Sequence, residues 1–174
     1  MKPADLIADY EYLLADMDIE GPVLDLACGE GQNGMVFSMK GFSVTFCDKS
    51  AKALARVAQT AKENGVKADL WEVDLEQDNV NPFLAGHYAI ILVFRYLHRP
   101  LMPCIRKALR KGGLLFYETY TVDQQEYGRP RNPRYLLKSG ELLNLFSNWR
   151  IFHYFEGVKY APERAVAQLV CQKP

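Results

Sequence analysis

The feature that most constrains the fold is a short apolar segment that breaks into glycines. Residues 23–28 read Val-Leu-Asp-Leu-Ala-Cys, and Gly29, Gly31 and Gly34 follow closely. Such an apolar run is typical of a strand buried in a parallel sheet. Glycine lets the backbone after the strand turn sharply and approach a ligand without a Cβ in the way. The segment therefore predicts a strand, a ligand-binding turn, and a helix that begins near Gln32.

Two cofactors are compatible with this turn. Gly29, Gly31 and Gly34 satisfy the fingerprint G-x-G-x-x-G, which leaves a nicotinamide or flavin enzyme open. Asp25 completes the pattern acid-x-x-x-Gly-x-Gly, which resembles motif I of the class I S-adenosylmethionine-dependent methyltransferases. That resemblance implies that Gly29-Glu30-Gly31 holds the amino-acid end of S-adenosylmethionine, with Asp25 at the same site. Gly34 is then incidental to the cofactor.

The acid at the end of the second predicted strand supports a nucleoside. Residues 43–47 lead into Asp48, about 20 residues beyond Gly29, where a carboxylate accepts hydrogen bonds from ribose hydroxyls. Both candidate cofactors carry such hydroxyls, so Asp48 does not choose between them. The neighbouring Lys49 is expected at the same site. The structural alternative for Asp48 is a helix-start acid ahead of Ser50.

A second acid ends the third predicted strand. Residues 68–73 lead into Asp74, and the family resemblance implies that this acid and the backbone amide of Leu75 lie near the adenine ring. An ordinary solvated strand end also explains Asp74, since Glu76 follows in a polar loop. Phe94, at the end of the fourth predicted strand, is also expected beside the cofactor.

The exit of the fourth strand is our first choice for substrate contacts. Residues 88–94 are almost uninterruptedly apolar, as in a central strand buried on both faces. Residues 95–99 follow, and ligands of such sheets bind beyond the carboxyl ends of the strands. We expect His98 to act as a base, Tyr96 to stack or donate a hydrogen bond, and Arg95 to hold an anion. Strand capping and pairing with nearby acids are the structural alternative.

The C-terminal part distinguishes the two cofactor classes. Gly112-Gly113 resembles the glycine-pair turn before strand five of class I methyltransferases. The segments 149–156 and 165–172 are β-like, and the connection 157–164 is too short for a crossover helix, so the pair must be antiparallel. A dinucleotide fold would continue with parallel strands. We therefore predict one α/β domain over residues 1–174, with a doubly wound Rossmann-like sheet of seven strands, mostly parallel, and an antiparallel strand seven in a C-terminal hairpin.

Helices are expected where apolar residues recur at helical spacing. The family resemblance places the first of them beside the cofactor pocket, with Tyr10 as an aromatic wall. The expected helices run from Leu6 to Met17, from Gln32 to Met39, between the N-cap Ser50 and Gly65, through Pro100 and Pro103 to Leu109, and from Ser139 to Phe146.

A polar stretch over residues 120–137 is long enough to fold over a pocket. It contains Arg129, Arg131 and Arg134. If these arginines face the strand-four exit, they favour an anionic substrate. A solvated loop is an equally good explanation.

Composition excludes several classes of protein. Lysine plus arginine and aspartate plus glutamate both number 21, so no excess charge exists to hold a polyanion, and we expect no nucleic-acid partner. The 4 cysteines are widely spaced, which predicts reduced thiols in a cytoplasmic protein. No apolar run approaches the roughly 20 residues of a membrane span, and no metal site is predicted. We expect a monomer or a homodimer.

The most specific resemblance is that of the segment 25–33, Asp-Leu-Ala-Cys-Gly-Glu-Gly-Gln-Asn, to the small bacterial tellurite-resistance and thiopurine methyltransferase subgroup. It implies transfer of the sulfonium methyl of S-adenosylmethionine to a small molecule by in-line displacement, with S-adenosylhomocysteine as product. The strand-four exit lacks the Asn/Asp-Pro-Pro-Tyr motif of nucleobase amino-methylases, which also favours a small acceptor. Two alternatives stay open: an NAD(P)-dependent oxidoreductase and a non-catalytic S-adenosylmethionine-binding module.

Overall fold

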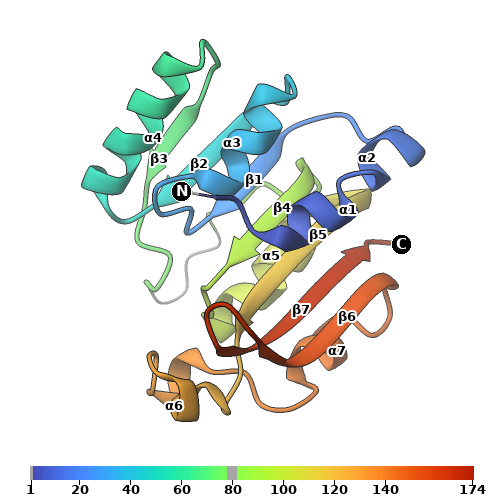
Figure 1. The fold of residues 1–174 in the computed structure, drawn as a ribbon. Coiled ribbons are helices and arrows are strands. Elements are labelled where there is room, and N and C mark those ends of the chain that lie inside the picture. Colours follow the sequence, from blue (N-terminus) through green and yellow to red (C-terminus); the bar gives the residue numbers. More distant parts are fainter. Residues whose placement is uncertain (1, 78–81) are drawn as a thin grey trace.

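A computed structural model describes residues 2–77 and 82–174 and contains one seven-stranded sheet (Figure 1). The strand order is β3-β2-β1-β4-β5-β7-β6. Strand β7 is antiparallel to both β5 and β6, and the other pairs are parallel, which confirms the predicted hairpin. The strands are β1 Val23–Leu26, β2 Val44–Asp48, β3 Asp69–Glu72, β4 Tyr88–Phe94, β5 Leu109–Tyr120, β6 Arg150–Lys159 and β7 Arg164–Gln172.

Helices cover both faces of the sheet, as the doubly wound fold requires. One face is covered by α1, α2, α3 and α4, and the other by α5 and α7 (Figure 1). The helices are α1 Asp5–Tyr10, α2 Leu13–Asp16, α3 Gln32–Met39, α4 Ala51–Glu63, α5 Met102–Ala108, α6 Gln124–Tyr127 and α7 Glu141–Leu145, with 3-10 turns η1 Arg99–Leu101 and η2 Pro133–Tyr135.

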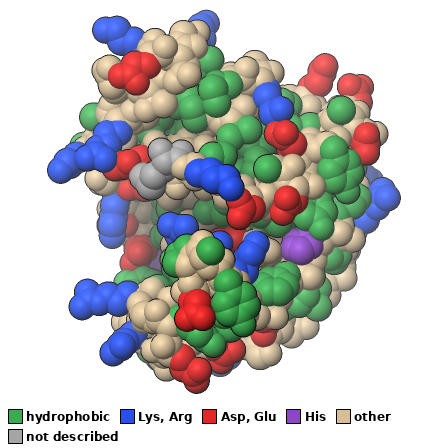
Figure 2. Space-filling view, viewed as in Figure 1, with side chains coloured by type: hydrophobic (Ala, Val, Ile, Leu, Met, Phe, Trp, Pro, Cys, Tyr) green, Lys and Arg blue, Asp and Glu red, His purple; other side chains and the backbone are tan. Residues whose placement is uncertain are grey.

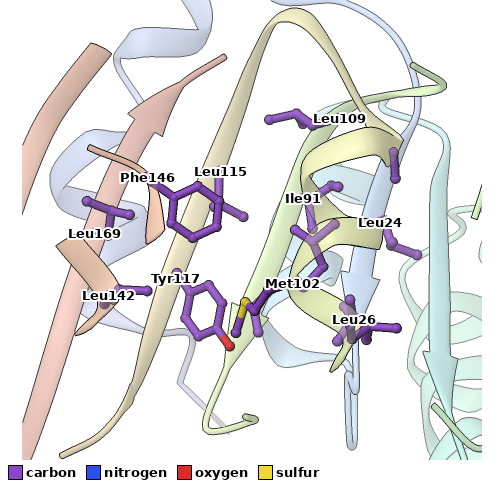
Figure 3. Packing of buried hydrophobic residues seen from close by; sticks show 14 of the residues in the cluster. Leu24, Leu26, Ile91, Met102, Leu109, Leu115, Tyr117, Leu142, Phe146 and Leu169 are labelled. Atoms are coloured by element: carbon purple, nitrogen blue, oxygen red, sulfur yellow. The ribbon is translucent and has the colours of Figure 1, made fainter. Parts of the chain in front are cut away.

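The core lies in two layers because successive residues of a buried strand point to opposite faces. Leu115 and Tyr117 of β5 face the α5/α7 side, where Figure 3 shows them near Phe146 and Leu142. Phe116, between them, packs with the helices of the opposite face. The two layers hold the strand ends in fixed positions, and the candidate site is built on those ends.

Two expectations about local structure are wrong. The first predicted helix is divided into α1 and α2, each of which buries one pair of apolar residues against the sheet, namely Leu6 with Ile7 and Leu13 with Leu14. Gly112-Gly113 lies within β5 instead of before it. Gly112 has φ +75°, and a Cβ on Gly113 would stand 2.8 Å from the backbone oxygen of Ala89. The glycines therefore allow an irregular β4/β5 pairing, whose register shifts between Tyr88 and Ile90.

Other local predictions are confirmed. The helix over Gln32–Met39 has the predicted bounds. The Ser50 side chain accepts a hydrogen bond from the Ala53 amide as an N-cap, and Gly65 has the left-handed backbone (φ +65°) of a helix end. All four cysteines are free thiols. Among the described residues, no helix has the length and apolar character needed to cross a membrane.

Candidate active site

The glycine turn after β1 is shaped by two glycines with different surroundings. Gly29 (φ +55°) and Gly31 (φ +75°) both adopt the left-handed conformation. A Cβ on Gly31 would lie 2.7 Å from Cγ2 of Val57, so this glycine is needed for packing against α4. A Cβ on Gly29 would meet nothing within 4 Å, although Gly29 lines a cavity. The turn therefore leaves open space for a ligand beside Gly29.

Asp25 lies beneath this turn. Its side chain is 2 % exposed, and its Oδ2 accepts a hydrogen bond of 2.8 Å from the backbone N–H of Gly34. Burial raises the pKa of Asp25 to about 7, and the negative charge of Asp48 contributes in the same direction, while the hydrogen bond from Gly34 opposes both. Asp25 thus joins β1 to the first turn of α3 and also borders the cavity beside Gly29.

Gly34 has a structural role that the sequence analysis missed when it treated this residue as incidental. A Cβ at this position would lie 2.6 Å from Cε1 of Phe46 and 2.7 Å from Oδ2 of Asp25. Both distances are shorter than van der Waals contact permits for a Cβ atom. Gly34 is therefore required by the close approach of α3 to the sheet.

We expect Gly34→Ala to lower the free energy of unfolding by about 1–3 kcal/mol, the usual cost of overpacking a core. Alanine is the better helix former by about 1 kcal/mol, but this gain does not offset the clash with Phe46 and Asp25. Urea denaturation of the two proteins measures the difference. Ser38→Ala is a matched control, since it changes a buried α3 residue whose hydroxyl has no hydrogen-bond partner within the described part of the chain. Equal stability of Gly34→Ala and wild type would contradict the prediction.

Asp48 connects β2 to the glycine turn. Its Oδ2 accepts a hydrogen bond of 2.9 Å from the Gly29 amide, and its Oδ1 accepts one of 2.9 Å from the Ser50 amide. Each carboxylate oxygen keeps a further lone pair for a ligand. The helix-start role that we considered as an alternative is therefore present, and it is compatible with ligand binding because the carboxylate also lines a cavity.

Two adjoining cavities lie at the carboxyl ends of the strands. The first has a volume of about 230 Å³. It is lined by Ala27, Asp48, Lys49, Val73, Asp74, Leu75, Glu76, Arg95 and Tyr96. The second, of about 580 Å³, is bordered by residues 2–5, the glycine turn, the ends of β4 and β5, and the β6–β7 turn. Ala27 and Arg95 line both, so the two cavities form one cleft around the end of β1.

All the residues predicted to bind the cofactor except Gly31 border this cleft. Those in the first cavity are Asp48, Lys49, Asp74 and Leu75, and those in the second are Asp25, Gly29, Glu30 and Phe94. Gly31 stands at the start of α3, where it lines a separate groove with Glu30. The Glu30 carboxylate forms an ion pair with Arg56 of α4.

The three predicted catalytic residues are not brought together. Arg95 lines both cavities, and Tyr96 lines the first. His98 is 6 % exposed and lines neither, so the predicted base lies outside the cleft. Burial, and then the carboxylates of Glu76 and Asp74, raise the pKa of Tyr96 far above neutrality. Tyr96 is therefore a hydrogen-bond donor at neutral pH, and its buried hydroxyl has no partner among the described residues.

Of the two explanations left open for the arginines of residues 120–137, the exposed loop agrees better with the structure. Arg129, Arg131 and Arg134 are exposed and line neither cavity. Arg134 lies 4.0 Å from Glu76, which does line the first cavity. Arg99 binds the Glu141 carboxylate through Nε (2.6 Å) and Nη2 (2.8 Å), so it is occupied by a structural ion pair.

Sequence reasoning missed the polar residues at the β5 and β7 end of the second cavity. Glu118 is 4 % exposed, and Gln168 opposite it donates a hydrogen bond to its carboxylate. Nε of Arg164 is buried, lies 4.0 Å from Glu118, and has no hydrogen-bond partner among the described residues. The available signal was a lone acid in the apolar run 114–119. Arg164 and Gln168 become informative only when β7 pairs with β5.

The structure gives less support to a cysteine nucleophile, a metal site or a charged binding surface. Burial raises the pKa of the Cys47 thiol to about 12 and that of Cys28 higher still, so neither forms a thiolate nucleophile at neutral pH. Within residues 2–77 and 82–174, no three His, Cys, Asp or Glu side chains gather as metal ligands would. Figure 2 shows acidic and basic side chains interspersed on the face that it presents, without a patch of one charge.

A family model and the curated relatives point to the same protein family. A family model described as "Tellurite resistance protein TehB" matches residues 14–162. A protein of Haemophilus influenzae named "Probable S-adenosyl-L-methionine-dependent methyltransferase TehB" is 25 % identical over 144 residues, which cover 78 % of this chain and 48 % of the relative. The chain thus spans about half the length of the curated relatives that it matches.

Solved structures share the fold. The crystal structure of TehB from Haemophilus influenzae superposes with a TM-score of 0.79 at 18 % identity, covering 98 % of this chain and 62 % of that one. A structure from Methanosarcina mazei, titled as an S-adenosylmethionine-dependent methyltransferase, gives 0.71 at 14 % identity and covers 99 % of both chains. These structural matches confirm the predicted class I methyltransferase fold. The family model confirms the resemblance to the tellurite-resistance subgroup.

Proposed function

Because the chain belongs to the TehB family of tellurite resistance proteins, we propose that it is an S-adenosylmethionine-dependent methyltransferase acting on a small anionic acceptor. The observation that carries this proposal is the cleft at the strand ends. Its first cavity is lined by three carboxylates, Asp48, Asp74 and Glu76, and its second contains the glycine turn and the Nε of Arg164, which has no hydrogen-bond partner among the described residues. We propose that the first cavity takes the nucleoside and the second takes the amino-acid end and the acceptor.

The residues present fit this cofactor. Open space beside Gly29 accommodates the amino-acid end, and Asp48 has free lone pairs for ribose hydroxyls. Asp74 and the amide of Leu75 lie in the same cavity and suit the adenine amino group and ring nitrogen. S-adenosylmethionine, when bound, supplies a sulfonium methyl group that passes to the acceptor in line as the C–S bond breaks and sulfur keeps the electron pair.

The chain's own contribution is orientation and the exclusion of water. Fixing both reactants at near-attack distance supplies about 7–11 kcal/mol in favourable cases. An anionic acceptor needs no general base, so the position of His98 outside the cleft is compatible with turnover. Arg95 and Arg164 line the second cavity and are suited to hold such an anion.

Ligand-dependent thermal stability tests the cofactor. S-adenosylmethionine and S-adenosylhomocysteine are expected to raise the melting temperature, since ligand at 100 times its dissociation constant stabilises by about 2.7 kcal/mol. NAD(P)H, the ligand of the oxidoreductase alternative, is not expected to do so. Formation of S-adenosylhomocysteine is then measured with tellurite, selenite, small thiols and hydroxy acids. No stabilisation by either sulfur nucleoside would contradict the proposal, and binding without product formation would favour a non-catalytic module.

Arg164→Met is expected to slow methyl transfer to an anionic acceptor by about tenfold or more, since hydrogen bonds to charged groups contribute about 1.5–3 kcal/mol. Methionine keeps the apolar stem of the side chain and removes the cation. S-adenosylhomocysteine affinity, measured calorimetrically, is expected to stay the same. Arg131→Met is the control, because Arg131 is exposed and lines neither cavity. If Arg131→Met slowed methyl transfer as much as Arg164→Met does, the loop of residues 120–137 would be the anion site instead.

Cytoplasmic location, the absence of a nucleic-acid partner and a monomeric or homodimeric state stay predictions of the sequence.

A further inference from the structure

Glu118 is a buried carboxylate at the edge of the second cavity. It lies near the carboxyl end of β5, directly opposite Gln168 of β7, and is 4 % exposed. Gln168 Nε2 donates to Oε2 of Glu118, while Oε1 lies 4.0 Å from Nε of Arg164. Burying a carboxylate is costly unless it is paired and hydrogen-bonded. These two partners therefore make an ionised Glu118 possible at the wall of the cavity.

A chain of hydrogen bonds continues from Gln168 away from the cavity. Oε1 of Gln168 lies 3.4 Å from Nε2 of His153 on β6, and Nδ1 of His153 lies 3.0 Å from the Tyr10 hydroxyl on α1. The Tyr10 and His153 rings also pack together, with centroids 4.9 Å apart. The outer end of the chain lines a separate surface cavity, to which Asp9 and Lys159 contribute the charged side chains.

The direction of each hydrogen bond follows from the carboxylate. An ionised Glu118 only accepts, so the amide nitrogen of Gln168 must face it and the amide oxygen must face His153. His153 must then carry its proton on Nε2, which leaves Nδ1 to accept from the Tyr10 hydroxyl. Every group donates inward, from Tyr10 through His153 and Gln168 to Glu118.

We propose that Glu118 is the residue that receives a hydrogen bond from the methyl acceptor, and that Tyr10, His153 and Gln168 are positioning residues that hold it. The inference rests on the proposed function. It adds a substrate class: an acceptor that carries an O–H or N–H group in addition to its anionic oxygen. The side-chain amide of Gln168 does not readily relay a proton. The chain of hydrogen bonds therefore orients Glu118 and does not carry protons away from it. A purely structural connection between α1 and the hairpin is the competing explanation.

The tautomer of His153 tests the arrangement independently of activity. In protein labelled with ¹⁵N-histidine, at a pH where the imidazole is neutral, the ring couplings are expected to show the Nε2–H tautomer. The Nε–H signal of Arg164 is expected to shift in both Glu118→Gln and His153→Phe, although His153 does not touch Arg164. The proposal would be overturned if His153 were the Nδ1–H tautomer, or if the Arg164 Nε–H signal did not shift in His153→Phe.

Kinetics separate positioning from a merely structural role. Glu118→Gln and His153→Phe are expected to lower kcat by about tenfold or more, with S-adenosylhomocysteine affinity within about twofold of wild type, as for loss of a charge-assisted hydrogen bond. His153→Gln keeps an N–H donor toward Gln168 and is expected to restore most of the activity. His87→Phe, an exposed histidine beside β4, is the matched control.

Each other outcome has a defined meaning. Equal losses in His153→Phe and His153→Gln, or full activity of Glu118→Gln, would overturn the proposal. Cofactor affinity that falls together with kcat would assign Glu118 to the cofactor instead. If the wild type binds no S-adenosylmethionine, the proposed function fails, and the tautomer and the Arg164 signal still decide whether the positioning chain exists.

Discussion

Replacing Asp48 by alanine is expected to weaken S-adenosylmethionine and S-adenosylhomocysteine binding about 10- to 100-fold. Hydrogen bonds to a charged group contribute about 1.5–3 kcal/mol, and each 1.4 kcal/mol changes affinity about tenfold. Asp48 also accepts hydrogen bonds from the backbone amides of Gly29 and Ser50. Its replacement by alanine therefore leaves two unpaired donors in the turn beside the proposed ligand site. Isothermal titration calorimetry measures the change.

Two further variants show what part of that effect belongs to the ligand. Asp48→Asn keeps one carbonyl oxygen for a backbone amide but loses the charge, so we expect intermediate affinity. Asp69→Ala removes an exposed aspartate from the first residue of β3, at the amino ends of the strands and away from the cleft. This variant is expected to bind both sulfur nucleosides normally. Unchanged affinity of Asp48→Ala would remove this residue from the ribose site. An equal loss in Asp69→Ala would indicate a general effect on the fold.

The motif residues were predictable from the sequence because their positions are set by local rules. The chain must turn where glycines follow a buried strand, as Gly29 does after β1, and an acid after the next strand must stand at the same sheet edge, because parallel strands end together. The pair Asp25 and Asp48 therefore lies beside the glycine turn as expected. The C-terminal hairpin followed from the shortness of its connection alone.

The residues of the proposed acceptor site were not predictable in the same way. Glu118, Gln168 and Tyr10 are far apart in the sequence and meet only when β7 inserts between β5 and β6 and α1 packs beside them. No spacing rule reports such contacts. His98 illustrates the opposite error: its segment, residues 95–99, follows β4 as predicted, but the chain enters η1 after His98 and the side chain is buried.

Glycine spacing misled in one respect. The fingerprint treats Gly31 and Gly34 as marks of a dinucleotide, whereas the first is required by Val57 and the second by Phe46 and Asp25. In this chain the spacing follows from how closely α3 approaches the buried strands β1 and β2. The third glycine therefore reports helix packing and says little about which nucleoside is bound.

The second large effect concerns pH. Asp25 has a pKa of about 7 in the folded protein, against 3.8 as the ordinary value that it takes when unfolded. Between these values the folded protein holds the proton more tightly than the unfolded chain does. The contribution of Asp25 to stability is therefore fully present below about pH 4 and is lost as the pH rises to about 7. A shift of this size corresponds to about 4 kcal/mol.

Asp25→Asn removes the titrating group and keeps an oxygen that can accept the Gly34 N–H. We expect the free energy of unfolding of this variant, relative to wild type, to increase by about 2–4 kcal/mol between pH 4 and 7 and to level off above that range. Urea denaturation at several pH values measures the difference, in which the titration of all other groups cancels. A constant difference for Asp25→Asn would mean that Asp25 stays ionised beneath the turn, and that the ligand meets a carboxylate there at every pH of this range.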